Sequence, residues 1–276
     1  MKFISQLAAT LLAVTFTTLQ AEERSPLWEA GVGLAGIHFP DYRGARHQQN
    51  YLLPMPYFIY RGDKFKINRG GLQGLLYQSA RVNLDISLGG AMPVKSDDNV
   101  VRRGMPNLDP MFEIGPSLKI LLAQARTEKL SLRLPLRAAF ATDLTHIHHA
   151  GWLFHPQLGL ETVIGATRRW KFGVAVGPLY ASQNYHDYYY GVAPQYATLT
   201  RPSYTGKHGY SGTRLGLSLR WQFQSLQFGA FLRYDNLSGT AFEDSPLLET
   251  EHSLMAGFGI VWVFARSKHR VSVTDE

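Results

Sequence analysis

Apolar and polar residues alternate along several stretches of this sequence. From Leu130 to Phe140 every even position is apolar, whereas the odd positions carry Ser, Arg, Pro and Ala. From Leu215 to Phe223 the apolar positions are odd, and Gly, Ser, Arg and Gln lie between them. Successive side chains of a β-strand point to opposite faces, so this alternation predicts strands with one apolar face and one polar or small face. The pattern recurs at 82–88, 112–120, 170–176, 226–234 and 254–264.

Two all-β folds fit this alternation: a soluble sandwich, whose apolar faces share a core, and a membrane barrel, whose apolar faces meet lipid. The polar faces mix Gly and Ser with charges of both signs, which is typical of a water-filled barrel interior. No apolar run after residue 21 is as long as a transmembrane helix. We therefore predict a transmembrane antiparallel β-barrel, closed because an open edge in the bilayer would leave backbone groups without partners.

Aromatic residues are plentiful, with 14 Tyr, 15 Phe and 5 Trp, and many lie near the predicted strand ends. In a membrane barrel such residues form girdles at the two interfaces, so their positions favour the barrel over the sandwich. The girdle candidates are Trp28, Tyr57, Tyr60, Trp170, Tyr180, Trp221, Tyr234 and Trp262.

The N-terminus has the features of a secretory signal peptide. A basic start, Met1-Lys2, precedes an apolar stretch over 3–19, and Ala21 comes just before an acidic pair. We predict cleavage after Ala21; the competing interpretation is an N-terminal membrane anchor. The sequence has no Cys, which excludes a lipoprotein anchor and disulfides. The expected organisation is a signal peptide at 1–21, a barrel at 22–264 and a polar C-terminal extension at 265–276 in the periplasm.

The number of strands follows from the connections between them. Eleven strands are predicted near 28–38, 51–60, 64–69, 80–92, 110–123, 130–142, 152–164, 170–181, 209–223, 226–235 and 253–264. Bacterial single-chain barrels have an even number of strands. The long connections at 39–50, 95–108, 182–207 and 236–251 should be extracellular, and the tight turns at 165–169 and 224–225 periplasmic. This arrangement requires one more strand, around Leu72–Tyr77, and gives twelve.

The positive charge does not indicate nucleic acid. The formal net charge is +7, and loss of Lys2 with the signal peptide reduces it to +6, but Lys and Arg are scattered rather than gathered in one block. Attraction to anionic lipid headgroups is the expected consequence. We therefore predict outer-membrane lipids as partners and no nucleic acid.

Several short motifs resemble the MipA/OmpV family of outer-membrane proteins, in order and spacing. They are Phe39-Pro40-Asp41-Tyr42-Arg43-Gly44, Leu53-Pro54-Met55-Pro56-Tyr57, Tyr60-Arg61-Gly62-Asp63-Lys64-Phe65, Gly104-Met105-Pro106-Asn107-Leu108, Glu113-Ile114-Gly115-Pro116 and Tyr189-Tyr190-Gly191-Val192. The resemblance covers essentially the whole mature chain. One feature departs from the family, whose members usually end at the aromatic residue of the last strand: here twelve residues follow Phe264.

The resemblance implies a cell outer-membrane location and a non-enzymatic role. The family's named member is a scaffold that brings a murein lytic transglycosylase together with a murein synthase, and other members are linked to adhesion and antibiotic response. The family carries no catalytic residues to transfer. The leading expectation is therefore a scaffold for peptidoglycan-remodelling enzymes, without catalytic, cofactor-binding or metal-binding residues.

Two rival functions remain open at this stage. A small pore would be lined by the charges Arg133, Arg137, Glu113, Lys119, Arg220 and Arg233. A lipid-modifying enzyme would need a Ser beside a His. No His has a Ser two positions on, where both would share a strand face, although distant residues could still meet across strands.

Three other motifs have a functional and a plain structural interpretation. His146 and His148 share a face near Asp143, but a solvated loop explains them better than a metal site. The run Tyr185–Tyr190 fits either a recognition surface or a girdle. Arg61-Gly62-Asp63 is predicted to be a hairpin turn rather than an adhesion motif.

Overall fold

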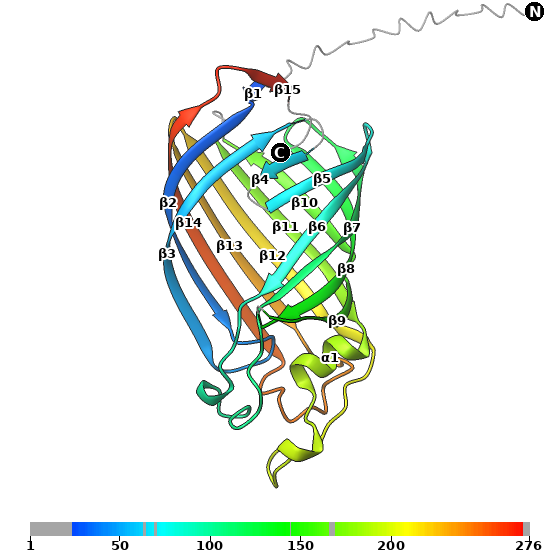
Figure 1. Ribbon diagram of the computed structural model, residues 1–276. Helices are drawn as coiled ribbons and strands as arrows, with labels where there is room; N and C mark the ends of the chain where they lie inside the picture. The colour runs from blue at the N-terminus through cyan, green and yellow to red at the C-terminus, as the bar shows by residue number, and fades with distance from the viewer. Residues whose placement is uncertain (1–23, 63–64, 69–70, 144, 166–168, 273–276) are drawn as a thin grey trace, which may run out of the picture.

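The chain folds into an antiparallel barrel. The computed structural model describes residues 24–272 except 63–64, 69–70, 144 and 166–168, so the predicted signal peptide lies outside the described residues. The wall strands are β2 (Trp28–Pro40), β3 (Gln48–Arg61), β4 (Phe65–Asn68), β5 (Gly71–Gln78), β6 (Val82–Ala91), β7 (Met111–Gln124), β8 (Glu128–Thr142), β9 (Ile147–Phe154), β10 (Gln157–Ile164), β11 (Trp170–Ala181), β12 (Gly209–Phe223), β13 (Leu226–Asn236) and β14 (His252–Arg266). They curve around one axis and are tilted against it (Figure 1).

In the part of the chain that the structure describes, the wall has twelve strand positions. β9 and β10 are separated only by His155-Pro156, and both pair with β8 on one side and β11 on the other. They therefore act as one strand with a break, and the predicted strand at 152–164 begins earlier, at Ile147. The predicted twelfth strand is confirmed as β5, and β14 pairs with β2 to join the two ends of the chain.

Side chains alternate between the outside and the lumen as the sequence predicts. On β14, Ile260 and Trp262 are exposed on the outer surface, whereas Val261 and Val263 between them are buried. On β2, Val32 is exposed and Glu29 is buried. The exposed apolar side chains belong on the lipid-facing surface, because the strand period places every second residue there.

One interface of the barrel carries the expected aromatic girdle. The rings of Trp170 and Trp221 lie 6.0 Å apart on neighbouring strands, and those of Trp262 and Phe264 lie 6.1 Å apart. The girdle prediction is wrong for Tyr57. That side chain is buried inside the barrel, where its hydroxyl donates a hydrogen bond to Gln227.

The two ends of the barrel differ. At one end the connections are short, and β1 (Arg24–Pro26) pairs with β15 (Arg270–Ser272) outside the wall (Figure 1). The other end carries the long loops with α1 (Gln183–Tyr190), η1 (Ser96–Asp98) and η2 (Pro194–Tyr196). Among the described residues, every helix is too short or too polar to cross a bilayer. Residues Ala265 and Arg266 continue β14, and 273–276 lie outside the described residues.

Candidate functional site

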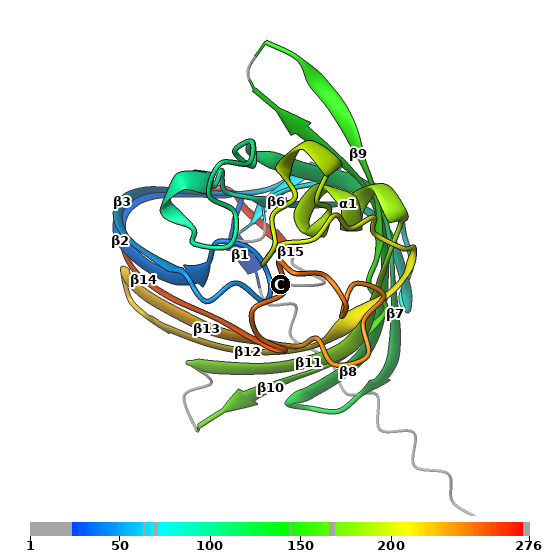
Figure 2. The ribbon, with the colours of Figure 1, turned by 90° about the horizontal axis from the view of Figure 1, so that it is seen from below.

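Four long connections pack together over one end of the barrel, and we call them the loop plug: 41–47, 92–110, 182–208 and 237–251 (Figure 2). Their apolar side chains form a continuous buried cluster with the strand ends below. At its centre the ring of Tyr190 stacks on that of Phe242, with centroids 3.7 Å apart and planes 8° from parallel. Both side chains are almost fully buried, so the loop plug is packed like a protein core.

The motif Phe39–Gly44 ties the loops to one another. The Tyr42 hydroxyl donates to the Leu247 carbonyl at 2.8 Å, and the Tyr190 hydroxyl donates to the Arg43 carbonyl at 2.8 Å. Gly44 adopts a φ of +86°, a conformation that favours glycine, and its carbonyl accepts hydrogen bonds from two backbone N–H groups of the 237–251 loop. The motif therefore shapes the loop plug.

The run Tyr185–Tyr190 contributes to the same packing. It forms most of α1, whose N-cap Ser182 accepts a hydrogen bond from the backbone N–H of Tyr185. Tyr185, Tyr189 and Tyr190 are buried in the loop plug. Neither an exposed recognition surface nor an interfacial girdle describes this segment.

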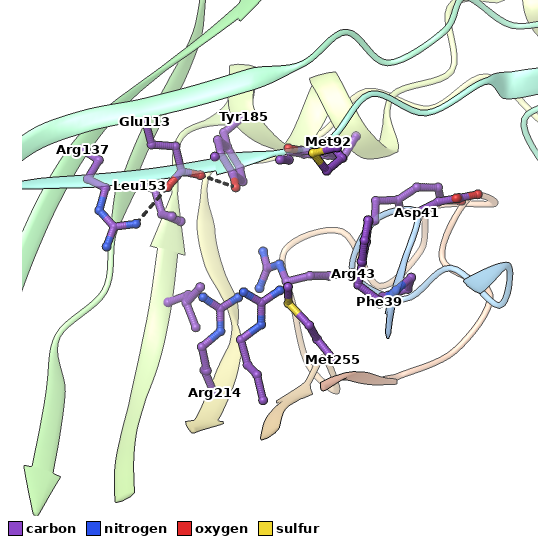
Figure 3. Close-up of a pocket in the computed structure, with 18 of the residues that line it drawn as sticks. Phe39, Asp41, Arg43, Met92, Glu113, Arg137, Leu153, Tyr185, Arg214 and Met255 are labelled. Atoms are coloured by element: carbon purple, nitrogen blue, oxygen red, sulfur yellow. Dashed lines mark hydrogen bonds and ion pairs between the residues drawn. The ribbon is translucent and has the colours of Figure 1, made fainter. Parts of the chain in front are cut away.

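A cavity of about 260 Å³ lies beneath the loop plug, and we call it the arginine pocket (Figure 3). Its charged lining residues are Arg43, Arg137, Arg214, Arg233, Glu113 and Asp41. The carboxylate of Asp41 is already held by other loop residues, since it accepts hydrogen bonds from Gln49 and from Asn99, the latter at 2.9 Å. The guanidinium groups of Arg43 and Arg214 point toward one another on one side of the cavity.

On one side of the arginine pocket the charges are balanced. Arg137 Nη1 lies 3.0 Å from Glu113 Oε2, and the Tyr185 hydroxyl donates to Glu113 Oε1 at 3.1 Å. Arg137 Nε also donates to Ser87 Oγ at 2.9 Å. This pair carries no net charge, and its hydrogen bonds orient both partners.

On the opposite side positive charge is in excess. Asp235, only 1% exposed, forms ion pairs with Arg214 at 2.7 Å and with Arg233 at 3.5 Å. Asp235 also interacts electrostatically with Arg43. Three guanidinium groups thus surround one carboxylate, and two positive charges have no carboxylate partner among the described residues. Buried charge is costly unless it is paired, so this arrangement favours binding of an anion.

The sequence identified part of this site. Glu113, Arg137 and Arg233 were predicted to line the lumen, and all three line the arginine pocket. Arg133 lies away from it and pairs with Asp85 at 3.9 Å. Lys119 lies opposite Arg133 on the neighbouring strand, and Arg220 lies opposite Lys171, so each faces another basic residue.

Three residues of the site were missed: Arg43, Arg214 and Asp235. Arg214 is one position before the alternating segment that begins at Leu215, and the same alternation extended by one residue would have placed it in the lumen. Asp235 likewise follows Arg233 at the strand period. Arg43 lies in a loop, where no periodicity reveals its direction.

Other predicted features lie outside the arginine pocket. Backbone N–H groups and the Thr145 hydroxyl donate to Asp143 next to His146, which holds the pKa of that carboxyl well below its usual range. His148 lies on β9, and the described residues contain no cluster of three or more His, Cys, Asp or Glu side chains arranged for a metal ion. Arg61 donates to the Pro26 carbonyl at 2.9 Å, whereas Asp63 lies outside the described residues.

A buried hydrogen-bond chain links two loops of the plug, 41–47 and 182–208, through Ser211 of β12. Arg43 donates to Ser211 Oγ, and Ser211 lies 3.0 Å from His186 Nε2. His186 Nδ1 faces the Lys207 carbonyl, which can only accept, so Nδ1 carries the proton and Nε2 accepts from Ser211. Burial, together with the positive charge of Arg43, lowers the pKa of His186 to about 4.

The loop plug should lose stability in acid through His186. The unfolded histidine titrates near its ordinary pKa of about 6.5, whereas the folded one titrates near 4. The unfolded state therefore binds more protons between these values, and stability should fall by about 1.4 kcal/mol per pH unit as pH drops through this window. The protection factors of the amides in 182–208, which correct for the intrinsic pH dependence of exchange, should fall below pH 6.5, and His186→Gln should flatten this dependence.

The exposed His146 provides the control for this measurement, since its side chain is 85% exposed. His146→Gln should leave the acid-induced loss of protection unchanged. An unchanged acid response in His186→Gln would show that other groups govern it.

Residues 32–264 match the protein family described as MltA-interacting protein MipA. No curated protein sequence matches the chain. Among solved structures, LpxR from Salmonella typhimurium shares 8% identity with a TM-score of 0.45, covering 84% of this chain and all of that chain. A bacterial polysaccharide outer membrane secretin shares 10% identity with a TM-score of 0.43, covering 86% and 99%. The NanC porin shares 7% identity with a TM-score of 0.39, covering 84% and 98%.

The family match spans the wall from β2 to β14 and all four loops of the plug. The motifs that build those loops are the ones on which the sequence resemblance rests. With a lipid-facing apolar surface and twelve antiparallel strand positions, the fold is a barrel of the outer-membrane type, and the chain belongs to the MltA-interacting protein MipA family.

Proposed function

We propose that this barrel lies in the cell outer membrane and serves as a non-enzymatic scaffold for a murein lytic transglycosylase and a murein synthase. The observation that carries the proposal is the family match, since the family is described by its interaction with MltA. The chain would hold such enzymes at the membrane by contacts on its periplasmic side, where peptidoglycan lies.

The β1–β15 pair is the surface that we propose for these contacts. It lies at the end with the short turns, which in outer-membrane barrels is the periplasmic end (Figure 1). The pair lies outside the barrel wall, and a backbone hydrogen bond from Leu27 to His269 extends it. A two-stranded sheet of this kind offers its edges to a partner strand.

Crosslinking in intact cells tests the scaffold. We expect the full-length chain to recover a lytic transglycosylase and a synthase. Val271→Pro should reduce this recovery several-fold, because Val271 pairs with Ser25 in the ladder and proline removes the backbone donor. Leu199→Pro is the matched control, because Leu199 is fully exposed in an extracellular loop. Recovery of neither enzyme by the unaltered chain would contradict the proposal.

The loop plug argues against the alternative of a small pore. Its buried apolar side chains cover the extracellular end of the lumen. We expect the purified barrel to be silent in planar lipid bilayers, whereas discrete conductance steps would favour the pore.

One buried Ser–His pair has the geometry that a serine nucleophile would need. Ser211 and His186 come together from distant segments at hydrogen-bond distance, the arrangement that activates a serine nucleophile. Both residues are fully buried, neither lines the arginine pocket, and the Ser211 hydroxyl already accepts from Arg43. We therefore assign the pair a structural role. Overexpression of the chain should leave the lipid mass spectrum of the membrane unchanged, and new lipid species that disappear in Ser211→Ala would overturn this assignment.

A further inference from the structure

The barrel wall is not fully hydrogen-bonded between β3 and β6. β3 pairs with β2 along its whole length, but on its other side it pairs with β4 only at Tyr60 and Arg61. β6 pairs with β7 along its whole length, but its pairs with β5 end at Asp85. Among the described residues, no strand adjoins residues 48–56 of β3 or residues 86–91 of β6 on these facing edges. In Figure 1 the strands at the back of the barrel are visible through the gap between β3 and β6.

Exposure of the side chains supports an opening at this place, which we call the side window. On the other strands buried and exposed residues tend to alternate, but on β3 five consecutive residues, 50–54, are exposed. Leu52 points outward and is 63% exposed, and Leu53, on the lumen side, is still 48% exposed. With no strand on this edge among the described residues, β3 is accessible on both faces here.

The prolines of β3 face the side window. Two backbone hydrogen bonds at the ends of the β2–β3 ladder fix its pattern: the N–H of Asp41 donates to the His47 carbonyl, and the N–H of Arg61 donates to the Leu27 carbonyl. The odd residues of β3 therefore form the hydrogen bonds to β2. Even residues therefore direct their N–H and C=O groups to the side window. Pro54 and Pro56 are two of them, and proline has no N–H to leave unpaired. This edge is adapted to lack a strand partner, and it would pair poorly with a strand from another protein.

The side window adjoins the arginine pocket. Gly89, Gly90 and Met92, at the end of the exposed edge of β6, line the cavity. The backbone N–H of Leu121 donates to the Arg81 carbonyl, which shows that the odd residues of β6 form the hydrogen bonds to β7. The backbone groups of Gly90, an even residue, therefore point to the side window. The loop plug covers the pocket from the extracellular side. The side window therefore offers a lateral route into the pocket from the bilayer.

We propose that the arginine pocket binds the phosphate headgroup of an anionic membrane lipid, which enters through the side window. The two uncompensated positive charges around Asp235 attract the phosphate, and arginine matches its geometry with paired hydrogen bonds. The acyl chains lie against Leu52, Leu53 and Leu88, which are exposed at the rim. The polar groups of the lipid between its headgroup and its acyl chains hydrogen-bond to the unpaired backbone C=O and N–H groups at the edges of β3 and β6. Left unpaired in hydrocarbon, these backbone groups would be costly. This role is separate from the scaffold function and does not depend on it.

Native mass spectrometry of the purified barrel with added dioleoyl phosphatidylglycerol tests the proposal. We expect a bound phosphatidylglycerol and at least tenfold weaker binding of phosphatidylcholine, which has no net charge. Arg214→Gln combined with Arg233→Gln should lower phosphatidylglycerol binding by about tenfold or more. Arg220→Gln is the matched control, since Arg220 shares the strand and face of Arg214 but lies six residues away from it toward the other end. Equal binding of both lipids, or an unchanged affinity in the double variant, would overturn the proposal.

Two further measurements keep the result interpretable. Inorganic phosphate should compete only weakly with the lipid; saturation by phosphate without any lipid binding would mean that the pocket takes a free anion instead. The chain has no Cys, so a single cysteine can be labelled cleanly. A bulky polar thiol reagent on Leu53→Cys should block lipid binding without touching the arginines. The same label on Leu158→Cys, 42% exposed on the outer wall, should not. Equal binding in the two labelled variants would exclude entry through the side window.

Discussion

Asp235→Asn is expected to destabilise the barrel by about 3–5 kcal/mol, the cost of removing one partner from a buried ion pair. The carboxylate is 1% exposed and pairs with Arg214 and Arg233, while Arg43 is close enough to interact with it. Neutralising it leaves three guanidinium groups facing one another in a confined space. Denaturant unfolding in detergent micelles, followed by tryptophan fluorescence, measures the loss.

Two variants make this prediction specific. Asp244→Asn is the matched control, because Asp244 is 72% exposed and its ion pair with Lys207 spans 3.6 Å, so its loss should cost less than about 1 kcal/mol. Asp235→Asn combined with Arg233→Met should be more stable than Asp235→Asn alone, because the second substitution removes one of the guanidinium charges that Asp235→Asn leaves unpaired. A double variant that is less stable than the single one would show that charge repulsion is not the cause.

The wall of the barrel was predictable because each strand carries its own evidence. The alternation around Leu215 and Leu130 gives the strand and the face of every residue within it. The strand β5 has little alternation, and its existence followed instead from the requirement that long loops share one end. The break in the β9–β10 strand at His155-Pro156 was missed, because apolar residues continue up to Phe154 and resume at Leu158, which hides the interruption.

The interior was less predictable because it is built from long-range contacts. Ser211 and His186 meet across 25 residues and Tyr190 contacts Arg43 across 147, and no short period encodes either contact. Proline cannot donate a ladder hydrogen bond, so it is expected at strand ends and loop entries. Pro40 does end β2, but Pro54 and Pro56 lie in the middle of β3, because that edge has no partner. A sequence pattern reports the face of a residue but not whether its strand has a neighbour.

Gly177→Ala is expected to disrupt barrel assembly. A methyl group at this position would overlap the carbonyl oxygen of Pro156 and lie 2.8 Å from the Cα of Gln157, both of them backbone atoms that cannot turn aside. β11 or the β9–β10 break would have to shift, at a cost of about 3 kcal/mol or more, the upper end for overpacking. Gly177 also lies opposite Arg214 on β12, so the shift would reach the arginine pocket.

The heat-dependent mobility shift of folded barrels on detergent gels measures this effect, as a loss of the folded band in unheated Gly177→Ala. The control is Gly229→Ala on β13, where an added methyl group has no atom within 4 Å among the described residues. Gly229→Ala should retain the folded band and gain a few tenths of a kcal/mol, because alanine restricts the unfolded chain. If Gly177→Ala instead folded as well as Gly229→Ala, the wall would have to tolerate movement at the β9–β10 break, and that segment would be a flexible joint beside the arginine pocket rather than a fixed one.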